Sequence, residues 1–265
     1  MPIKIGKTEK YIYEMLEKQG ALLFCSIDPL DYKNEEDAVK TAKAVNEGGA
    51  DIIFIGGSTG AQGELLDSVA TKIKEVIDVP LVLFPGNLAT ITRHADAMLF
   101  MSLLNARNPY YVIQAQMLAA PTLKMHGIEP IPVGYVLVQP GGTAGWVGDA
   151  NMVPREKPKI AAALALAGQY LGNRFIYTDA GSNPRLQGFG PIPKEMIQMV
   201  RHAIDIPYIV GGGIISPEEL RTAYASGADI VKIGTAFQNS PDAAKKAAAL
   251  FKKTTIEEGR KKLKR

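Results

Sequence analysis

The sequence predicts a single (β/α)8 TIM barrel, and three observations lead to this fold class. Eight short apolar segments alternate with longer amphipathic segments along the chain. Each short segment is nearly continuous in apolar residues, which is typical of parallel strands that are covered on both faces. The chain has 265 residues, and one barrel of this kind takes about 250. We therefore expect residues 1–265 to form one barrel domain.

The strands are expected at residues 21–27, 50–55, 80–84, 97–101, 133–138, 174–178, 207–210 and 229–233. Helices are expected at residues 35–48, 64–77, 109–126, 157–171, 194–204, 216–226 and 241–253. Strict alternation with short links predicts right-handed crossovers and a parallel sheet. Eight units in one domain of this size favour closure into a barrel over an open, doubly wound sheet.

The third unit of the barrel is irregular. Only residues 86–96 lie between the third and fourth expected strands, and a full helical crossover needs a dozen or more residues. We expect an extended segment or a single turn there. The outer ring of helices would then have an irregular or missing third helix.

Composition and charge exclude several classes of protein. The net charge of +3 is too small to indicate nucleic-acid binding, and a single cysteine, Cys25, excludes an intramolecular disulfide. No stretch approaches the ~20 apolar residues that span a bilayer, and the polar, basic N-terminus lacks the apolar segment of a signal peptide. The cytoplasm is the expected location. The basic residues from Lys252 to Arg265 form either a solvated helix end or a weak, peripheral contact with anionic lipid.

Two glycine-rich segments follow the last two expected strands. Residues 209–215 read IVGGGII, and the eighth strand ends in Lys232, Ile233, Gly234 and Thr235. Glycines let backbone N–H groups approach an anion closely, and this fold usually binds phosphate after strands seven and eight. We therefore expect a phosphate site here, although two tight turns without a ligand would have the same sequence.

The ends of the first two strands offer a site for a cation. Asp28 ends the first strand, and Ser58 follows the second within a run of glycines. A carboxylate beside a hydroxyl at one rim can hold Mg²⁺, which takes few protein oxygens and completes its shell with water and substrate phosphates. Asp28 could equally form a turn with Pro29, and spacing alone does not decide between the two interpretations.

Several strings in the middle of the chain are not explained by composition or periodicity. They are FPGN (84–87), RHADA (93–97), SLLNARNPYY (102–111), GGTAGWVGDA (141–150), AGS (180–182) and GGGIISPEEL (211–220). In this order they resemble the signatures of the geranylgeranylglyceryl phosphate synthase family. The resemblance runs from about residue 21 to residue 238. SLLNARNPYY and GWVGDA are highly specific, whereas the glycine motifs occur in many phosphate-binding barrels.

The resemblance implies a Mg²⁺-dependent prenyltransferase. Members of this family transfer a C20 prenyl group from its diphosphate to the 3-hydroxyl of sn-glycerol 1-phosphate, which forms the first ether bond of archaeal membrane lipids. They tend to be homo-oligomers. The residues of this chain that match the family's metal ligands are Asp28 and Ser58. Those that match its glycerol phosphate loop and phosphate grip are Tyr177, Thr178, Asp179, Ala180, Gly181, Ser182, Asn183, Gly212, Gly213, Gly234 and Thr235.

The resemblance also suggests roles for two of these residues. Asp179 would take the hydroxyl proton as general base, and Tyr177 would bind the glycerol or face the allylic cation. Each has a structural alternative, a loop cap for Asp179 and a core aromatic for Tyr177. The chain departs from the family here: Asp179 stands where Glu is usual, Asn183 and Pro184 replace Gly-Ala, and residues 185–190 make the loop longer.

The prenyl chain needs a long apolar groove. The gap left by the missing third helix is a plausible opening, and Tyr110, Tyr111, Ile113 and Met117 of the following helix would line it. Three other functions fit part of the sequence. They are a related synthase with a different prenyl chain length, an isomerase or aldolase on a phosphate-binding barrel, and a phosphate-ligand sensor without activity.

Overall fold

The computed structural model describes residues 4–264, and its centre is a closed barrel of eight parallel strands in sequence order. The strands are β1 Leu22–Ile27, β2 Ile52–Gly56, β3 Leu81–Phe84, β4 Ala97–Leu103, β5 Glu129–Leu137, β6 Phe175–Asp179, β7 Tyr208–Gly211 and β8 Ile230–Ile233. The barrel closes where β1 pairs with β8, with Leu22 opposite Ile230. The predicted TIM barrel is confirmed.

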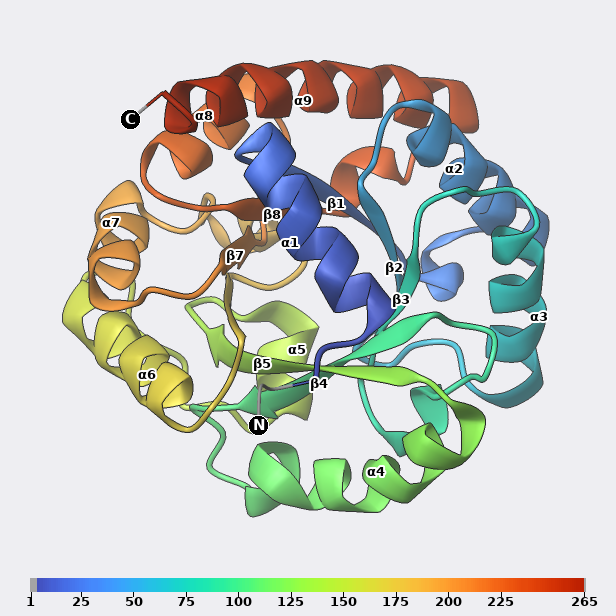
Figure 1. The fold of residues 1–265 in the computed structure, drawn as a ribbon, viewed down its shortest axis with the longest axis horizontal. Coiled ribbons are helices and arrows are strands. Elements are labelled where there is room, and N and C mark those ends of the chain that lie inside the picture. The colour runs from blue at the N-terminus through green and yellow to red at the C-terminus, as the bar shows by residue number, and fades with distance from the viewer. Residues whose placement is uncertain (1–3, 265) are drawn as a thin grey trace.

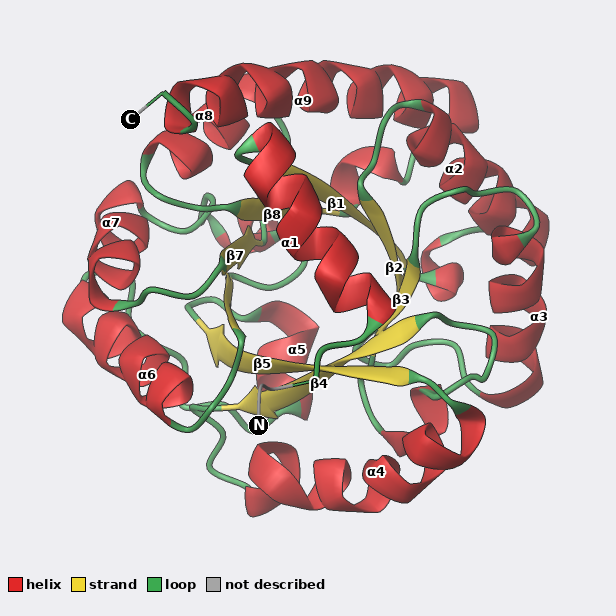
Figure 2. Cartoon of the chain, in the orientation of Figure 1, coloured by secondary structure: helices red, strands yellow, loops and turns green. Residues whose placement is uncertain are grey.

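The helices form a ring around the barrel (Figures 1 and 2). They are α2 Glu35–Glu47, α3 Gly63–Lys74, α4 Ala115–His126, α6 Pro158–Tyr170, α7 Lys194–Ala203, α8 Pro217–Ala225 and α9 Pro241–Lys262. Local sequence sets several helix starts: the side chains of Asn34, Ser216 and Ser240 cap α2, α8 and α9 by accepting a backbone N–H of the first turn. Helix α9 extends nine residues beyond the predicted end at residue 253, to Lys262.

The irregular third unit is also confirmed. Between β3 and β4 the chain forms only a short 3-10 turn, Leu88–Thr90, which is capped by Asn87. Strands β3 and β4 pair at only two positions, Val82 with Ala97 and Leu83 with Met98. By contrast, β4 and β5 pair at seven positions. The barrel wall is therefore weakest beyond Leu83 and Met98, where no crossover helix covers it.

The core has two layers because side chains alternate across each strand. Phe24, Phe54 and Tyr177 belong to the inner layer, which fills the barrel. Cys25, Ile53 and Val210 belong to the outer layer, which packs against the helices. Buried Cys25 is thus a small core residue, as its apolar neighbours in the sequence indicate.

Helix α1, Lys7–Gln19, covers one end of the barrel and was not predicted from the sequence. It crosses the barrel opening in Figure 1. Buried Glu9 pairs with Arg174, which directly precedes β6, with an Nη2–Oε2 distance of 2.7 Å. Glu129 at the start of β5 accepts the backbone N–H groups of Thr8 and Glu9. These contacts place α1 at the end where the strands begin, which leaves the carboxyl ends of the strands open.

In residues 4–264, no helix has both the length and the apolar content needed to cross a bilayer. The basic residues near the C-terminus lie at the end of α9, and several are paired: Lys261 with Glu258, and Lys262 with Asp229. The last basic residue of that segment, Arg265, lies outside the described residues.

Candidate active site

Two cavities meet at the carboxyl ends of the strands. The first, which we call the polar cavity, lies over β1, β2, β6, β7 and β8, and includes Asp28, Ser58, Gly213 and Thr235 in its wall. The second, the apolar cavity, is lined mainly by the segment from Phe84 to Leu103 and by α4 and its preceding turn. Gly57, Ser58, Phe84, Gly181, Ser182 and Lys232 line both. The polar cavity and the apolar cavity therefore share one opening, which we call the mouth.

The glycine segments after β7 and β8 form the floor of the polar cavity. Gly212 and Gly213 have φ angles of +87° and +79°, a conformation that glycine adopts without strain. A Cβ atom at Gly212 would lie 2.7 Å from the backbone N of Ala180 and 2.7 Å from Asp179 Oδ1. Within residues 4–264, the N–H groups of Gly212, Gly213 and Thr235 donate to no protein acceptor. Unpaired amides in a concave wall favour an anion.

Asp28 and Ser58 are brought together at the other side of the polar cavity. The carboxylate of Asp28 lies against the second strand's loop, because a Cβ at Gly57 would be 1.9 Å from Asp28 Oδ2. Its Oδ1 accepts the N–H of Leu30 at 3.1 Å, so Asp28 also makes the turn that the sequence offered as an alternative. Burial first, and the charge of Asp31 second, raise the pKa of Asp28 to about 6.

Asp28 and Ser58 fit a divalent cation that is also coordinated by the substrate. The Oδ2 atom of Asp28 faces the loop that carries Ser58, and both residues line the polar cavity. No group of three or more His, Cys, Asp or Glu side chains in residues 4–264 is placed to hold a metal ion. A cation between Asp28 and Ser58 would therefore take its remaining oxygens from water and substrate, which Mg²⁺ does readily.

Asp179 ends β6 and lines the apolar cavity, close to Gly181 and Ser182, which line both cavities. Its Oδ2 accepts the hydroxyls of Tyr177 at 2.8 Å and Tyr135 at 3.2 Å, and its Oδ1 accepts the N–H of Gly181 at 2.8 Å. Lys232 Nζ is 3.9 Å from Oδ2. Burial, and then the charge of Asp179, raise the pKa of both tyrosine hydroxyls. Both tyrosines therefore stay protonated and fix the carboxylate as donors.

The predicted substrate-binding residues separate into three groups, the first of which is Asp179 alone, in the wall of the apolar cavity. Gly181, Ser182, Asn183, Gly212, Gly213, Gly234 and Thr235 line the polar cavity. Tyr177, Thr178 and Ala180 are fully buried, and none of the three borders either cavity. Tyr177 packs among the inner aromatic residues and uses its hydroxyl on Asp179, while the Thr178 hydroxyl bonds to Tyr208 on the outer side of β6 at 2.7 Å.

Sequence reasoning missed two residues of the site, Tyr135 and Lys232. Tyr135 lies on β5 opposite Tyr177, and it is one of several apolar and aromatic residues in that strand, so its sequence gives no signal. Lys232 did give a signal, because a lysine inside an apolar strand must face a polar group or a cavity. It points into the mouth, where its Nζ lies 5.2 Å from the ring centroid of Phe84.

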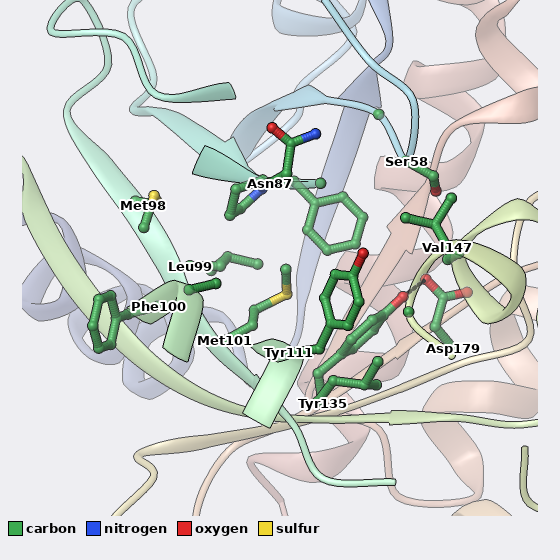
Figure 3. Close-up of a pocket in the computed structure, with 18 of the residues that line it drawn as sticks. Ser58, Asn87, Met98, Leu99, Phe100, Met101, Tyr111, Tyr135, Val147 and Asp179 are labelled. Atoms are coloured by element: carbon green, nitrogen blue, oxygen red, sulfur yellow. Dashed lines mark hydrogen bonds between the residues drawn. The ribbon is translucent and has the colours of Figure 1, made fainter. Parts of the chain in front are cut away.

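The apolar cavity passes through the barrel wall between β3 and β4. Consecutive residues of β4, from Met98 to Met101, all line it, although alternate residues of a strand point to opposite faces. This is possible because β3 and β4 stop pairing at Met98. Figure 3 shows Met98 and Phe100 at the end of the cavity farthest from Ser58 and Asp179, with Leu99, Met101 and Tyr111 between them.

The prediction of which residues of the following helix line this groove is partly wrong. Tyr111 lines the cavity, but Ile113 and Met117 are each 60% exposed, and Ala115, Gln116 and Ala119 take their places. The cause is a π-helical turn, Tyr110–Gln114, in which Ala115 N–H bonds to Tyr110 O. One extra residue in this turn shifts the face that an α-helical spacing predicts.

The loop that follows β6 forms one wall of the polar cavity. Asn183 adopts a left-handed conformation with φ of 45°, and a short 3-10 turn, Pro184–Gln187, follows it. A Cβ at Gly213 would lie 2.6 Å from Pro184 Cγ, so Pro184 seals the loop against the glycines. Arg185 pairs with Glu219 of α8, while Leu186 stands at the rim with 84% of its surface exposed.

Comparison with known proteins finds relatives over nearly the whole chain. Residues 14–253 match the PcrB family. Geranylgeranylglyceryl phosphate synthase of Pyrococcus horikoshii is 50% identical over 261 residues, which covers 98% of this chain and 95% of that protein. The enzyme of the same name from Thermococcus sibiricus is 52% identical over 238 residues, covering 90% and 91%. 

A solved structure gives the same result at the level of the fold. The crystal structure of (S)-3-O-geranylgeranylglyceryl phosphate synthase from Thermoplasma acidophilum, in complex with its substrate sn-glycerol-1-phosphate, has a TM-score of 0.88 and 33% sequence identity to this chain. The match covers 96% of this chain and all of the other. With the family match spanning most of its length, and with relatives at about half identity over nearly the whole chain, this chain belongs to the PcrB family.

Proposed function

We propose that this protein is a Mg²⁺-dependent prenyltransferase that joins geranylgeranyl diphosphate to the 3-hydroxyl of sn-glycerol 1-phosphate. One observation carries the proposal: a polar cavity with unpaired amides and an apolar cavity that leaves through the barrel wall share one mouth. A small phosphorylated alcohol fits the first and a prenyl chain fits the second. The relatives' names and the glycerol phosphate bound in the Thermoplasma structure support the same pair of substrates.

The phosphate of the glycerol substrate would bind the amides of Gly212, Gly213 and Thr235, together with Gly234. This anchoring removes orientational freedom and turns the free hydroxyl towards the mouth. Asp179 lies beside that phosphate position, since a Cβ atom at Gly212 would be 2.7 Å from its Oδ1. Ser182 and Asn183, at the rim of the same cavity, would contact the glycerol from the other side, while buried Tyr177 and Thr178 would support it indirectly.

Asp179 would accept the hydroxyl proton as the oxygen attacks C1 of the prenyl group. Each carboxylate oxygen has two lone pairs. Oδ1 of Asp179 accepts one hydrogen bond, from the N–H of Gly181, so its second lone pair can accept the proton. Tyr177 and Tyr135 hold Oδ2, so the carboxylate cannot rotate away. The apolar wall that begins at Phe84 and Tyr111 excludes water from the allylic carbon, which favours transfer over hydrolysis.

Asp28 and Ser58 would hold the magnesium ion, and the ion would supply positive charge for the diphosphate leaving group. The proposal follows from their place in one wall of the polar cavity and from the oxygen chemistry of the two side chains. Removal of divalent cations with EDTA should abolish transfer, and added Mg²⁺ should restore it. Full activity in EDTA would contradict this part of the proposal.

We also propose that the protein works in the cytoplasm as a homo-oligomer, with at most peripheral contact with membrane. The indole of Trp146 is 86% exposed on the short helix α5, Gly142–Val147, and large exposed aromatic residues are typical of subunit interfaces. Sedimentation at micromolar concentration tests the oligomer: Trp146→Ala should lower the sedimentation coefficient, and a monomeric wild-type protein would contradict it.

The reaction itself is tested by transfer of labelled sn-glycerol 1-phosphate to prenyl diphosphates of C15, C20 and C35 length. We expect product formation that requires Mg²⁺ and is fastest with the C20 donor. Product with the C35 donor alone would replace the proposed substrate with that of a related synthase. Absence of product with all three donors would contradict the prenyltransferase activity.

A further inference from the structure

Lys232 is the one basic side chain at the centre of the site. It lies on β8 and points into the mouth, where it lines both the polar and the apolar cavity. Among residues 4–264, no other lysine or arginine lines either cavity. Its side chain is only 12% exposed, so its position is fixed by the surrounding barrel.

The ammonium group of Lys232 faces three carboxylates. Its Nζ lies 3.9 Å from Asp179 Oδ2, and Asp28 and Asp31 line the polar cavity together with it. Three negative groups around one positive group are a poor environment for two further anionic substrates. Any phosphate oxygen that enters the junction must therefore lie near Lys232.

The N–H donors of Lys232 have no hydrogen-bond acceptor among residues 4–264. An ammonium has three N–H donors, and 3.9 Å to Asp179 is beyond hydrogen-bond distance. Lys232 makes no hydrogen bond to a residue in the described range 4–264. Asp179, in contrast, already accepts three hydrogen bonds from other groups. Lys232 is thus more than a counterion for Asp179, because neither group depends on the other for its hydrogen bonds.

We propose that the Lys232 ammonium binds the diphosphate of the prenyl donor and stabilises the charge that forms on it as the bond to C1 breaks. The inference rests on the proposed function and adds a catalytic residue to it. The glycine amides lie at the floor of the polar cavity, and the hydrocarbon leaves between β3 and β4. The diphosphate must join these two places, and Lys232 and Phe84 stand at that junction.

The charges balance in this step. The C1–O bond breaks with its electron pair on the diphosphate oxygen, the glycerol oxygen forms the new bond to C1, and its proton passes to Asp179. Lys232 stays protonated throughout and donates hydrogen bonds to the departing oxygen. Its ammonium therefore meets more negative charge in the transition state than before it, which is the condition for accelerating a reaction.

The test compares Lys232→Met, which removes the charge at similar volume, with Lys232→Arg, which keeps it. Binding of inorganic pyrophosphate with Mg²⁺, and separately of sn-glycerol 1-phosphate, is measured by calorimetry, and transfer rates are measured in parallel. Lys252→Met is the matched control, because Lys252 is similarly buried, with 15% of its side chain exposed, and pairs with Asp51 at the far end of the barrel.

We expect Lys232→Met to weaken pyrophosphate binding by roughly 10- to 100-fold, the size of one charged hydrogen bond. Glycerol phosphate affinity should change by less than about threefold, since its contacts are uncharged amides, and kcat should fall more than KM for glycerol phosphate rises. Lys232→Arg should recover part of the loss. Lys252→Met should lower the melting temperature and leave pyrophosphate affinity unchanged.

A second background separates a direct contact from an effect through Asp179. In Asp179→Asn protein, Lys232→Met should still reduce pyrophosphate affinity by the same factor. Unchanged pyrophosphate binding in Lys232→Met, loss of glycerol phosphate binding alone, or an effect that vanishes in the Asp179→Asn background would each overturn the proposal. A wild-type protein that binds pyrophosphate through Lys232 but transfers no prenyl group would instead refute only the proposed reaction.

Discussion

Asp179 is the residue on which the proposed chemistry turns. Three hydrogen bonds, from Tyr135, Tyr177 and Gly181, fix the carboxylate in the wall of the apolar cavity. Of these donors, the N–H of Gly181 is the first backbone amide after Ala180. A rigid carboxylate that needs no reorganisation is well suited to accept a proton in the transition state.

Asp179→Asn should lower kcat by about 100-fold or more, because an amide keeps the shape but cannot take the proton. Glycerol phosphate affinity should stay within about threefold, since the glycine amides are untouched. Steady-state kinetics and calorimetry measure the two effects. Asp51→Asn is the control: this carboxylate is equally buried and bonds Leu23 and Lys252 at the other end of the barrel, so its loss should reduce stability alone. Near-normal turnover of Asp179→Asn would remove Asp179 as the base.

Substitution of Gly212 by alanine adds one methyl group and tests whether the glycine amides of the polar cavity bind the phosphate. Gly212→Ala places a Cβ 2.7 Å from Asp179 Oδ1, at a φ of +87°. We expect glycerol phosphate affinity to fall by about tenfold or more, and stability to fall by about 1–2 kcal/mol. Gly172→Ala is a matched control, because Gly172 has a φ of +94° and open space around it. Gly172→Ala should show the same kind of backbone strain without loss of affinity for glycerol phosphate. Equal glycerol phosphate affinities in the two variants would contradict phosphate binding by the glycine amides.

At the scale of elements, the β3–β4 segment determines where a hydrocarbon can go. The short connection provides no helix to cover this side, and the two strands separate beyond Met98. Helix α4 lies across the opening, with Ala115 and Ala119 facing it. Small side chains on the covering helix leave space where a larger residue would fill the gap.

Met98→Trp should block the far end of the apolar cavity. Transfer from a C20 donor should fall by roughly tenfold, while a C10 donor, which does not reach Met98 in this geometry, should be used nearly as well as by the wild type. The ratio of kcat/KM for the two donors is the measurement. Met125→Trp is the control on the exposed face of α4, where 74% of the side chain is accessible. A ratio that is unchanged by Met98→Trp would place the prenyl chain elsewhere.

The sequence allowed prediction of those elements whose signal is local. The eight apolar runs, the glycines at 212, 213 and 234, and the short third connection are readable because each depends on neighbouring residues. Helix α1 was missed, since its few buried residues, such as Ile12, give only a narrow apolar face. The π-turn at Tyr110–Gln114 was missed as well, because nothing in residue spacing distinguishes an i→i+5 turn from an α-helical one.

The site was predictable only to the level of the strand ends. Sequence order places Asp28, Ser58, Asp179 and Gly213 at one rim, and the structure brings them together. The sequence does not indicate towards which face the side chain at a strand end points. Tyr177 faces the inner core and Thr178 the outer layer, whereas Tyr135 from the preceding strand reaches Asp179. These directions follow from barrel register, which involves pairs of distant residues.

On the scale of the whole molecule, one end of the barrel holds the cavities and the other end is closed by packed elements. The carboxyl ends of the strands carry the cavities, and the amino ends are closed by α1 through the buried pair of Glu9 and Arg174. A second buried pair, Asp51 with Lys252, ties α9 to β1 at that end. The glycine amides without protein acceptors and Lys232 thus lie at the carboxyl ends of the strands, and two buried charge pairs stabilise the amino ends.

Glu9→Gln should destabilise the protein by about 3 kcal/mol, because it leaves Arg174 without its buried partner. Turnover at a temperature well below the transition should be unchanged, since α1 lies opposite the site. Thermal unfolding and steady-state assays test both statements. The control, Glu14→Gln, removes a carboxylate from an exposed pair with Lys10 and should cost less than ~0.5 kcal/mol. Loss of turnover in folded Glu9→Gln protein would contradict this division between the two ends.

The central claim is that one mouth holds a phosphate and a diphosphate side by side. A crystal structure with sn-glycerol 1-phosphate, Mg²⁺ and a geranylgeranyl thiolodiphosphate, which resists cleavage, tests it most directly. We predict the glycerol phosphate on the amides of Gly212, Gly213 and Thr235, the diphosphate between Asp28 and Lys232, and the hydrocarbon passing between β3 and β4. A prenyl chain bound outside the apolar cavity, or the two anionic groups at separate openings, would contradict the account.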